Sequence, residues 1–144
     1  MIRSAVGPVA AAMLIAVTAV ALAGCSEQPI RIVTLGGEPW TVYQDTGDGM
    51  RQLPGFGDTD GMLFDLGSEV PPSGFPFVMD GVGFPLDIAW FDAAGALVST
   101  TRMATCDAAP CPLYYADGPY RWSVEAPAGA FADIVPTDRL SLGD

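Results

Sequence analysis

Residues 85–95, PLDIAWFDAAG, form the clearest strand pattern in the chain. Bulky apolar residues occupy every second position, namely Leu86, Ile88 and Trp90. The positions between them hold one acid and two apolar residues, Asp87, Ala89 and Phe91. Successive side chains of a β-strand point to opposite faces of its sheet, so one face of this strand is fully apolar and the other is mixed. Residues 92–95, DAAG, follow with turn chemistry, and the segment predicts a core strand that ends in a tight turn.

Short strand patterns separated by Gly and Pro recur on both sides of this segment. Residues 120–125 alternate like a half-buried strand, with apolar Tyr120, Trp122 and Val124 against polar Arg121, Ser123 and Glu125. Further strands are expected at 30–35, 40–44, 61–66, 75–79, 96–102 and 139–142. One short helix is expected near residues 128–134. This spacing predicts a mainly β fold, a small single-domain β-barrel or sandwich of about seven to eight short strands over residues 30–144.

Residues 1–24 have the pattern of a secretory signal peptide. Arg3 gives a positive start, residues 9–20 form an apolar run, and small residues precede Cys25. The alternative is a transmembrane helix, but the run is shorter than the roughly 20 apolar residues that span a bilayer. The tetrapeptide LAGC at 22–25 resembles the bacterial lipobox, in which the Cys becomes the first residue and carries a lipid. We therefore expect lipid on Cys25, a tether over residues 25–29, and an extracytoplasmic domain anchored to the cell membrane.

The composition excludes several activities. The 144 residues include six Arg, no Lys and no His, against 17 Asp plus Glu, which gives a net charge of −11. Electrostatic capture of nucleic-acid phosphates is therefore not expected. Without His the chain has neither a Ser-His-Asp triad nor a His-ligated metal site. We expect no cofactor and no metal, and we interpret the acids as a solvated surface.

Cys106 and Cys111 remain once Cys25 is assigned to lipid. A close pair of cysteines in an exported protein is typical of a disulfide. The alternatives are a redox pair or a metal site. Redox motifs usually have the spacing C-x-x-C, and two thiols without His are a poor zinc set. A structural disulfide is the favoured interpretation.

Asp58 and Asp60 have the first acidic spacing of a calcium loop, with Glu69 at its twelfth position. Met62, Phe64 and Leu66 stand where further oxygen ligands would be needed. The same residues fit a core strand, so a strand is favoured over a calcium site.

Several motifs together resemble the domain of unknown function 192 family. GMLF at 61–64 and PLDIAWFDAAG at 85–95 are the most specific of them, and the resemblance covers about residues 30–142. It implies a compact, mostly β domain that is often secreted or lipid-anchored and has no established activity. The sequence departs from the family pattern at 45–49, where DTGDG replaces a short helix. It also departs at Asp80, where the family has Lys, and at Thr137, where the family has Gly.

Four residues are candidates for a ligand site: Asp87, Met79, Asp80 and Glu125. Met79 and Asp80 correspond to a polar Met-Lys-Asn segment of the family, in which Asp80 reverses the charge. Asp87 is an acid inside an apolar strand, so it needs a partner such as a backbone turn or Arg121. Glu125 could join Asp87 as a pair of acids for general acid–base chemistry.

Two functions follow as hypotheses, and the sequence identifies no catalytic residue. The first is a lipid-anchored binding or accessory module with an unidentified small-molecule or protein ligand. The second is a carboxylate-dependent enzyme, such as a glycan-acting hydrolase. Small size and the absence of His and Lys favour the binding module.

Overall fold

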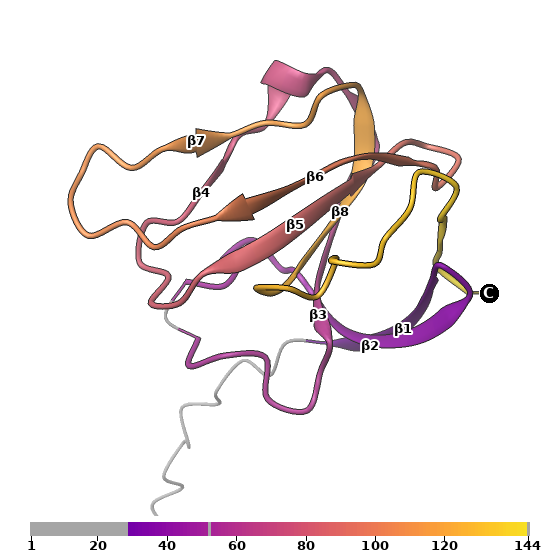
Figure 1. The fold of residues 1–144 in the computed structure, drawn as a ribbon, viewed down its shortest axis with the longest axis horizontal. Helices are drawn as coiled ribbons and strands as arrows, with labels where there is room; N and C mark the ends of the chain where they lie inside the picture. Colours follow the sequence, from indigo (N-terminus) through magenta and orange to yellow (C-terminus); the bar gives the residue numbers. More distant parts are fainter. Residues whose placement is uncertain (1–28, 52, 144) are drawn as a thin grey trace, which may run out of the picture.

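Seven strands form one curled sheet and two short strands form a second sheet (Figure 1). The computed structural model describes residues 29–51 and 53–143, so the predicted signal peptide, Cys25 and most of the tether lie outside the described residues. The long sheet has the order β6 (Leu97–Met103), β5 (Leu86–Phe91), β8 (Tyr120–Pro127), β3 (Gly61–Val70), β2 (Glu38–Gln44), β1 (Ile30–Leu35) and β9 (Leu140–Ser141). The second sheet pairs β4 (Phe77–Val78) with β7 (Leu113–Tyr114), and a 3-10 turn spans Pro72–Gly74. The expected mainly β fold is confirmed.

The long sheet curls so that its two edges approach each other at one end. Neighbouring strands are antiparallel except β2 and β3, which are parallel. β6 and β9 are the outer strands, yet Ala96, just before β6, bridges to Arg139, just before β9. The amide of Leu140 also donates to the carbonyl of Gly95 at 2.8 Å. In Figure 1 the β1–β2 hairpin and the β4–β7 sheet lie at opposite ends of the molecule.

Strands β5 and β8 are buried on both faces. All six residues of β5 are buried, as the alternation in PLDIAWFDAAG predicted for its apolar face. On one face Leu86, Ile88 and Trp90 pack with the loop after β2 and with β4 and β7. On the other face Ala89 and Phe91 pack with β1, β2 and the 127–142 segment. The expectation that Ser123 and Glu125 face solvent was wrong, because both are buried and their strand pairs them with the core residues Trp90 and Ile88.

Two glycines allow backbones to approach closely at the junctions of this sheet. A Cβ on Gly61 would lie 2.4 Å from the carbonyl oxygen of Glu125 on the adjacent strand. A Cβ on Gly95, whose φ is +79°, would lie 2.1 Å from the carbonyl oxygen of Leu140. Asp92 accepts the amides of Ala94 and Ala96 at 2.9 and 2.8 Å, which forms the predicted turn. The glycines of the two most specific motifs therefore permit these close approaches between neighbouring backbones.

The helix expected near residues 128–134 is instead a run of turns. The amides of Ala130, Ala132 and Ile134 each donate to the carbonyl three residues earlier, and they form no continuous helical ladder. Gly129 has a φ of +96°, which an α-helix does not accommodate. Phe131 packs into the core below these turns. Burial of one aromatic anchor thus orders the segment without a helix.

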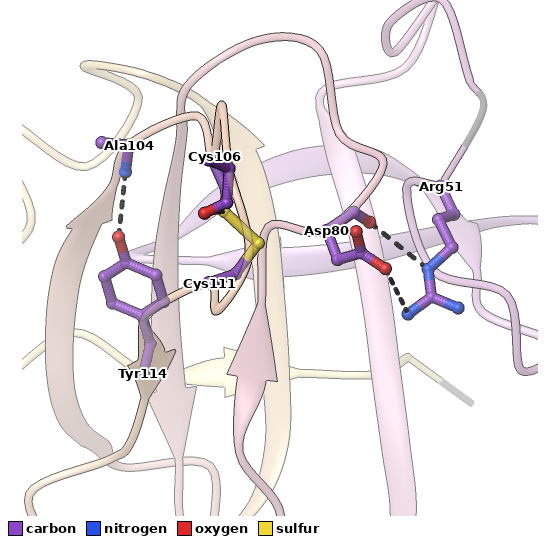
Figure 2. Close-up of a disulfide and its surroundings, with 7 residues drawn as sticks. Arg51, Asp80, Ala104, Cys106, Cys111 and Tyr114 are labelled. Atoms are coloured by element: carbon purple, nitrogen blue, oxygen red, sulfur yellow. Dashed lines mark hydrogen bonds and ion pairs between the residues drawn. A yellow bond between two sulfur atoms is a disulfide. The ribbon is translucent and has the colours of Figure 1, made fainter.

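Cys106 and Cys111 form a disulfide in the loop that follows β6 (Figure 2). This agrees with the interpretation of the cysteine pair. Seven residues after Cys106 the chain enters β7, whose Leu113 pairs with Val78 of β4. Strand β7 was not predicted because its two residues are too few to show alternation.

Asp87 is held by two groups on the mixed face of β5. Its carboxylate forms an ion pair with Arg102 of β6, and its Oδ2 accepts the amide of Gly129 at 2.7 Å. The expected backbone turn is confirmed by the Gly129 amide, whereas the alternative partner Arg121 is wrong, because Arg121 instead contacts Asp65 at 3.3 Å. Asp87 thus connects β5, β6 and the turn after β8.

Replacement of Asp87 tests this structural role. We expect Asp87→Asn to destabilise mildly, because the amide oxygen still accepts from Gly129. Asp87→Leu should lower the free energy of unfolding by about 1–3 kcal/mol, because the contacts of the carboxylate with Arg102 and with Gly129 are lost. Thermal and urea unfolding of the two variants provide the measurement. Melting temperatures above wild type in both variants would contradict the role.

Candidate functional site

A pocket of about 420 Å³ opens on the face of β8 that carries Glu125. Its walls come from three parts of the chain: the loop after β2, the middle of β3, and the segment around β4. Charged groups in its lining are Asp45, Asp48, Arg51, Asp80 and Glu125. Its volume lies in the range of small-molecule sites.

Glu125 is the most deeply buried charged group of this pocket. Its residue is 6% exposed, and on β8 it lies between Met62 of β3 and Ile88 of β5. Among the described residues no side-chain hydrogen bond or ion pair to Glu125 is present. Burial first, and the charge of Asp45 second, raise the pKa of Glu125 to about 8. The carboxyl is therefore mostly protonated at neutral pH.

Asp45 is fixed next to this carboxyl by backbone contacts. Its amide donates to the carbonyl of Leu63 at 2.8 Å, which continues the parallel pairing of β2 with β3. Its Oδ1 accepts the amide of Gly49 at 2.8 Å. The DTGDG segment is thus a loop folded around Asp45, as its glycine content predicted.

Arg51 and Asp80 lie together at the rim (Figure 2). The Nε of Arg51 donates to the backbone carbonyl of Asp80 at 3.3 Å, and its terminal nitrogen lies 3.9 Å from the Asp80 carboxylate. Both side chains are more than half exposed, so the pair adds little to stability. It does commit the guanidinium of Arg51 to Asp80.

Aromatic rings form the opposite wall. Phe77 meets Phe64 and Phe75 edge to face, with ring centroids 5.2 and 5.5 Å apart. The hydroxyl of Tyr120 donates to the carbonyl of Phe75 at 2.7 Å, which ties this wall to β8. Burial raises the pKa of Tyr120 to about 12, so the phenol remains a hydrogen-bond donor.

The four candidate site residues lie in three places: the pocket, the core beside it, and the opposite face of the sheet. Glu125 and Asp80 both line the pocket, whereas Met79 is buried in the core beside it. Asp87 lies on the opposite face of the sheet, because it pairs with Ala126 while Glu125 pairs with Ile88. Asp87 and Glu125 therefore do not share a cleft.

Asp45, Asp48 and Arg51 were not singled out from the sequence. The DTGDG insertion in place of a family helix was a signal for them, since it marks an acidic loop at a fixed place in the fold. Asp60 is instead a structural residue, and its Oδ2 accepts the amide of Thr41 at 2.8 Å. Within residues 29–51 and 53–143, no group of three or more His, Cys, Asp or Glu is arranged to hold a metal ion.

Glu125 predicts an unusual dependence of stability on pH. Its pKa is 4.5 in the ordinary state and about 8 when folded, so between these values the folded protein keeps a proton that the unfolded chain has released. The stabilisation is fully present below pH 4.5 and is lost as the pH rises through 8, by about 1.4 kcal/mol per pH unit.

Glu125→Gln should remove this loss, because a neutral amide does not titrate. The difference in free energy of unfolding between variant and wild type should then grow from pH 5 to pH 8 and level off above it. Urea unfolding across that range measures it, with exposed Glu38→Gln as the control that leaves the slope unchanged. Parallel curves for wild type and Glu125→Gln would contradict the assignment.

Over the described ranges 29–51 and 53–143, no helix has the length and apolar character that a membrane span requires.

Two solved structures resemble this fold. A proposed transcription regulator from Sinorhizobium meliloti 1021 has a TM-score of 0.68 at 22% identity, over 82% of this chain and 97% of that chain. A protein of unknown function from Novosphingobium aromaticivorans DSM 12444 has a TM-score of 0.65 at 20% identity, over 81% and 88%. At these identities the likeness shows the fold alone.

None of the curated proteins matches the chain. The family model DUF192, described as Uncharacterized ACR, matches residues 42–142. This range includes the two motifs that carried the resemblance, the strands on both sides of the pocket, and every charged residue of its lining. Because the match spans well over half of the sequence, the chain belongs to the DUF192 family.

Proposed function

We propose that this protein is an exported, lipid-anchored binding module that holds a small ligand over Glu125 at the outer face of the cytoplasmic membrane. The buried carboxyl of Glu125 at the pocket is the observation that carries the proposal. A buried polar group without a hydrogen bond lowers stability, and binding sites commonly trade stability for function. A ligand that forms a hydrogen bond or ion pair with the carboxyl of Glu125 would offset this loss of stability.

The anchoring is supported by the sequence. An apolar run after Arg3 ends in LAGC at 22–25, and the domain begins only a few residues later. A chain reaches at most about 3.5 Å per residue, so the five residues 25–29 would keep β1 within about 20 Å of the lipid. The acidic surface would favour a domain that stands off an anionic membrane rather than lying flat on it.

A carboxylate-dependent hydrolase is the second candidate. A carboxyl that stays protonated near neutral pH has the property of a general acid, and the carboxyl of Asp45 in the same pocket would be the second acid of the pair. Release of sugar from an oligosaccharide by wild type and not by Glu125→Gln would favour this enzyme over the binding module.

Cys25→Ser tests the anchor. We expect the variant to leave the membrane fraction and appear as soluble or unprocessed protein, because no thiol is left to carry lipid. Cell fractionation with immunoblotting provides the measurement. The double variant Cys106→Ser/Cys111→Ser is the matched control and should stay with the membrane. A Cys25→Ser protein that remains mature and membrane-bound would refute the anchor.

Leu66→Trp tests the pocket. Leu66 lies in the pocket lining and is partly exposed, so a larger ring there should fill the space. Protein extracted from membranes in mild detergent should release a small molecule on denaturation, and mass spectrometry should find it with wild type and not with Leu66→Trp. Leu97→Trp, on β6 away from the pocket, is the matched control. Equal recovery from all three proteins would contradict the pocket as the binding site.

A further inference from the structure

The geometry points to an organic cation as the ligand: an ammonium group beside Glu125, attached to an apolar body that lies against the phenylalanine wall. This inference rests on the proposed function and names the chemical class that the pocket takes. Three independent properties of the lining support it: the sign of its charges, the state of its one guanidinium, and its aromatic surface.

Acidic groups dominate the pocket. Asp45, Asp48, Asp80 and Glu125 line it, against Arg51 alone. Arg51 is already engaged by the carbonyl and carboxylate of Asp80 at the rim. The deepest of the acids, Glu125, is 6% exposed and has no hydrogen-bond partner among the described residues. A cationic donor would satisfy the carboxylate of Glu125, whereas an anion would be repelled.

The remaining lining is apolar and aromatic. Phe64, Phe75 and Phe77 meet edge to face, and Phe75 is 45% exposed at the entrance. Met50, Leu66, Val78 and Val82 complete the wall. Aromatic faces attract cations and also bury the hydrocarbon attached to them. A ligand with one ammonium and one apolar body uses both parts of the pocket.

This lining does not suit a bare metal ion. A hard divalent cation needs about six oxygen ligands, and the part of the chain that the structure describes brings no three acids together for one. The single deep carboxyl of Glu125 lies among apolar side chains, so its one negative charge can pair with one ammonium group.

Binding of the cation must displace a proton. The O–H bond of the Glu125 carboxyl breaks, the proton goes to the buffer, and the carboxylate pairs with the ammonium. The groups that face this carboxyl across the pocket are Asp45, Asp48 and Arg51 from the loop after β2, and Asp80 from the segment after β4. The affinity for a cation should therefore rise with pH until Glu125 is ionised, by up to about tenfold per pH unit.

Three probes that share one apolar body test this inference: 2-phenylethylamine, 2-phenylethanol and phenylacetate, which are positive, neutral and negative. Their dissociation constants are measured by NMR titration of the purified full chain in detergent at pH 6, 7 and 8. We expect the amine to bind most tightly, with an affinity that rises with pH. The alcohol should bind weakly and without pH dependence, and phenylacetate should bind least.

Glu125→Gln should abolish the pH dependence of amine binding and the preference for the amine over the alcohol. Asp117→Asn, which removes an exposed acid away from the pocket, is the matched control and should behave like wild type. Equal affinity for amine and alcohol, a flat pH profile, or no amine binding would overturn the cation inference. Leu66→Trp separates the two proposals: probe binding that Leu66→Trp leaves unchanged contradicts the pocket itself, whereas blocked binding without preference for the amine contradicts the cation alone.

Discussion

Strands β5 and β8 are buried on both faces, so an acidic side chain on them has to be paired or protonated inside the protein. Asp87 meets this constraint through Arg102 and the amide of Gly129. Glu125, on the other face, meets it by holding a proton, because burial and Asp45 raise its pKa. The same constraint thus produces a structural acid on one face of the sheet and a candidate binding acid on the other.

The scaffold positions Glu125 with few degrees of freedom. Its strand is paired on both sides, and Gly61 lets β3 approach the Glu125 backbone more closely than any other residue would. The rest of the pocket comes from β3, β4 and the loops beside them, which are held by contacts such as Tyr120 to Phe75 and Arg51 to Asp80. A rigid floor under variable loops is the usual arrangement of binding sites.

The sequence predicts the elements whose local chemistry is strong. The alternation of residues 86–91, the DAAG turn and the cysteine pair all appear as expected. Prediction from the sequence fails where tertiary contacts decide which residues are buried and which conformation a segment adopts. The alternation of polar Ser123 and Glu125 suggests a solvent-facing side, but the folded sheet buries both of them. Gly129 converts an alanine-rich segment into turns. The partner of Asp87 could not be chosen between arginines, because strand order and not sequence distance brings Arg102 beside it. The pocket rim comes from segments far apart in the chain, so its composition required the fold.

The protonation state of Glu125 is the central claim, and side-chain NMR measures it directly. The chain contains only four Glu, so labelling their carboxyl carbons with ¹³C gives few signals, and Glu125→Gln assigns the relevant one. Titration should show one carboxyl signal, absent from the variant, with a pKa of about 8. A Glu125 signal that titrates near 4.5 would show a solvated or paired carboxylate and would contradict the account.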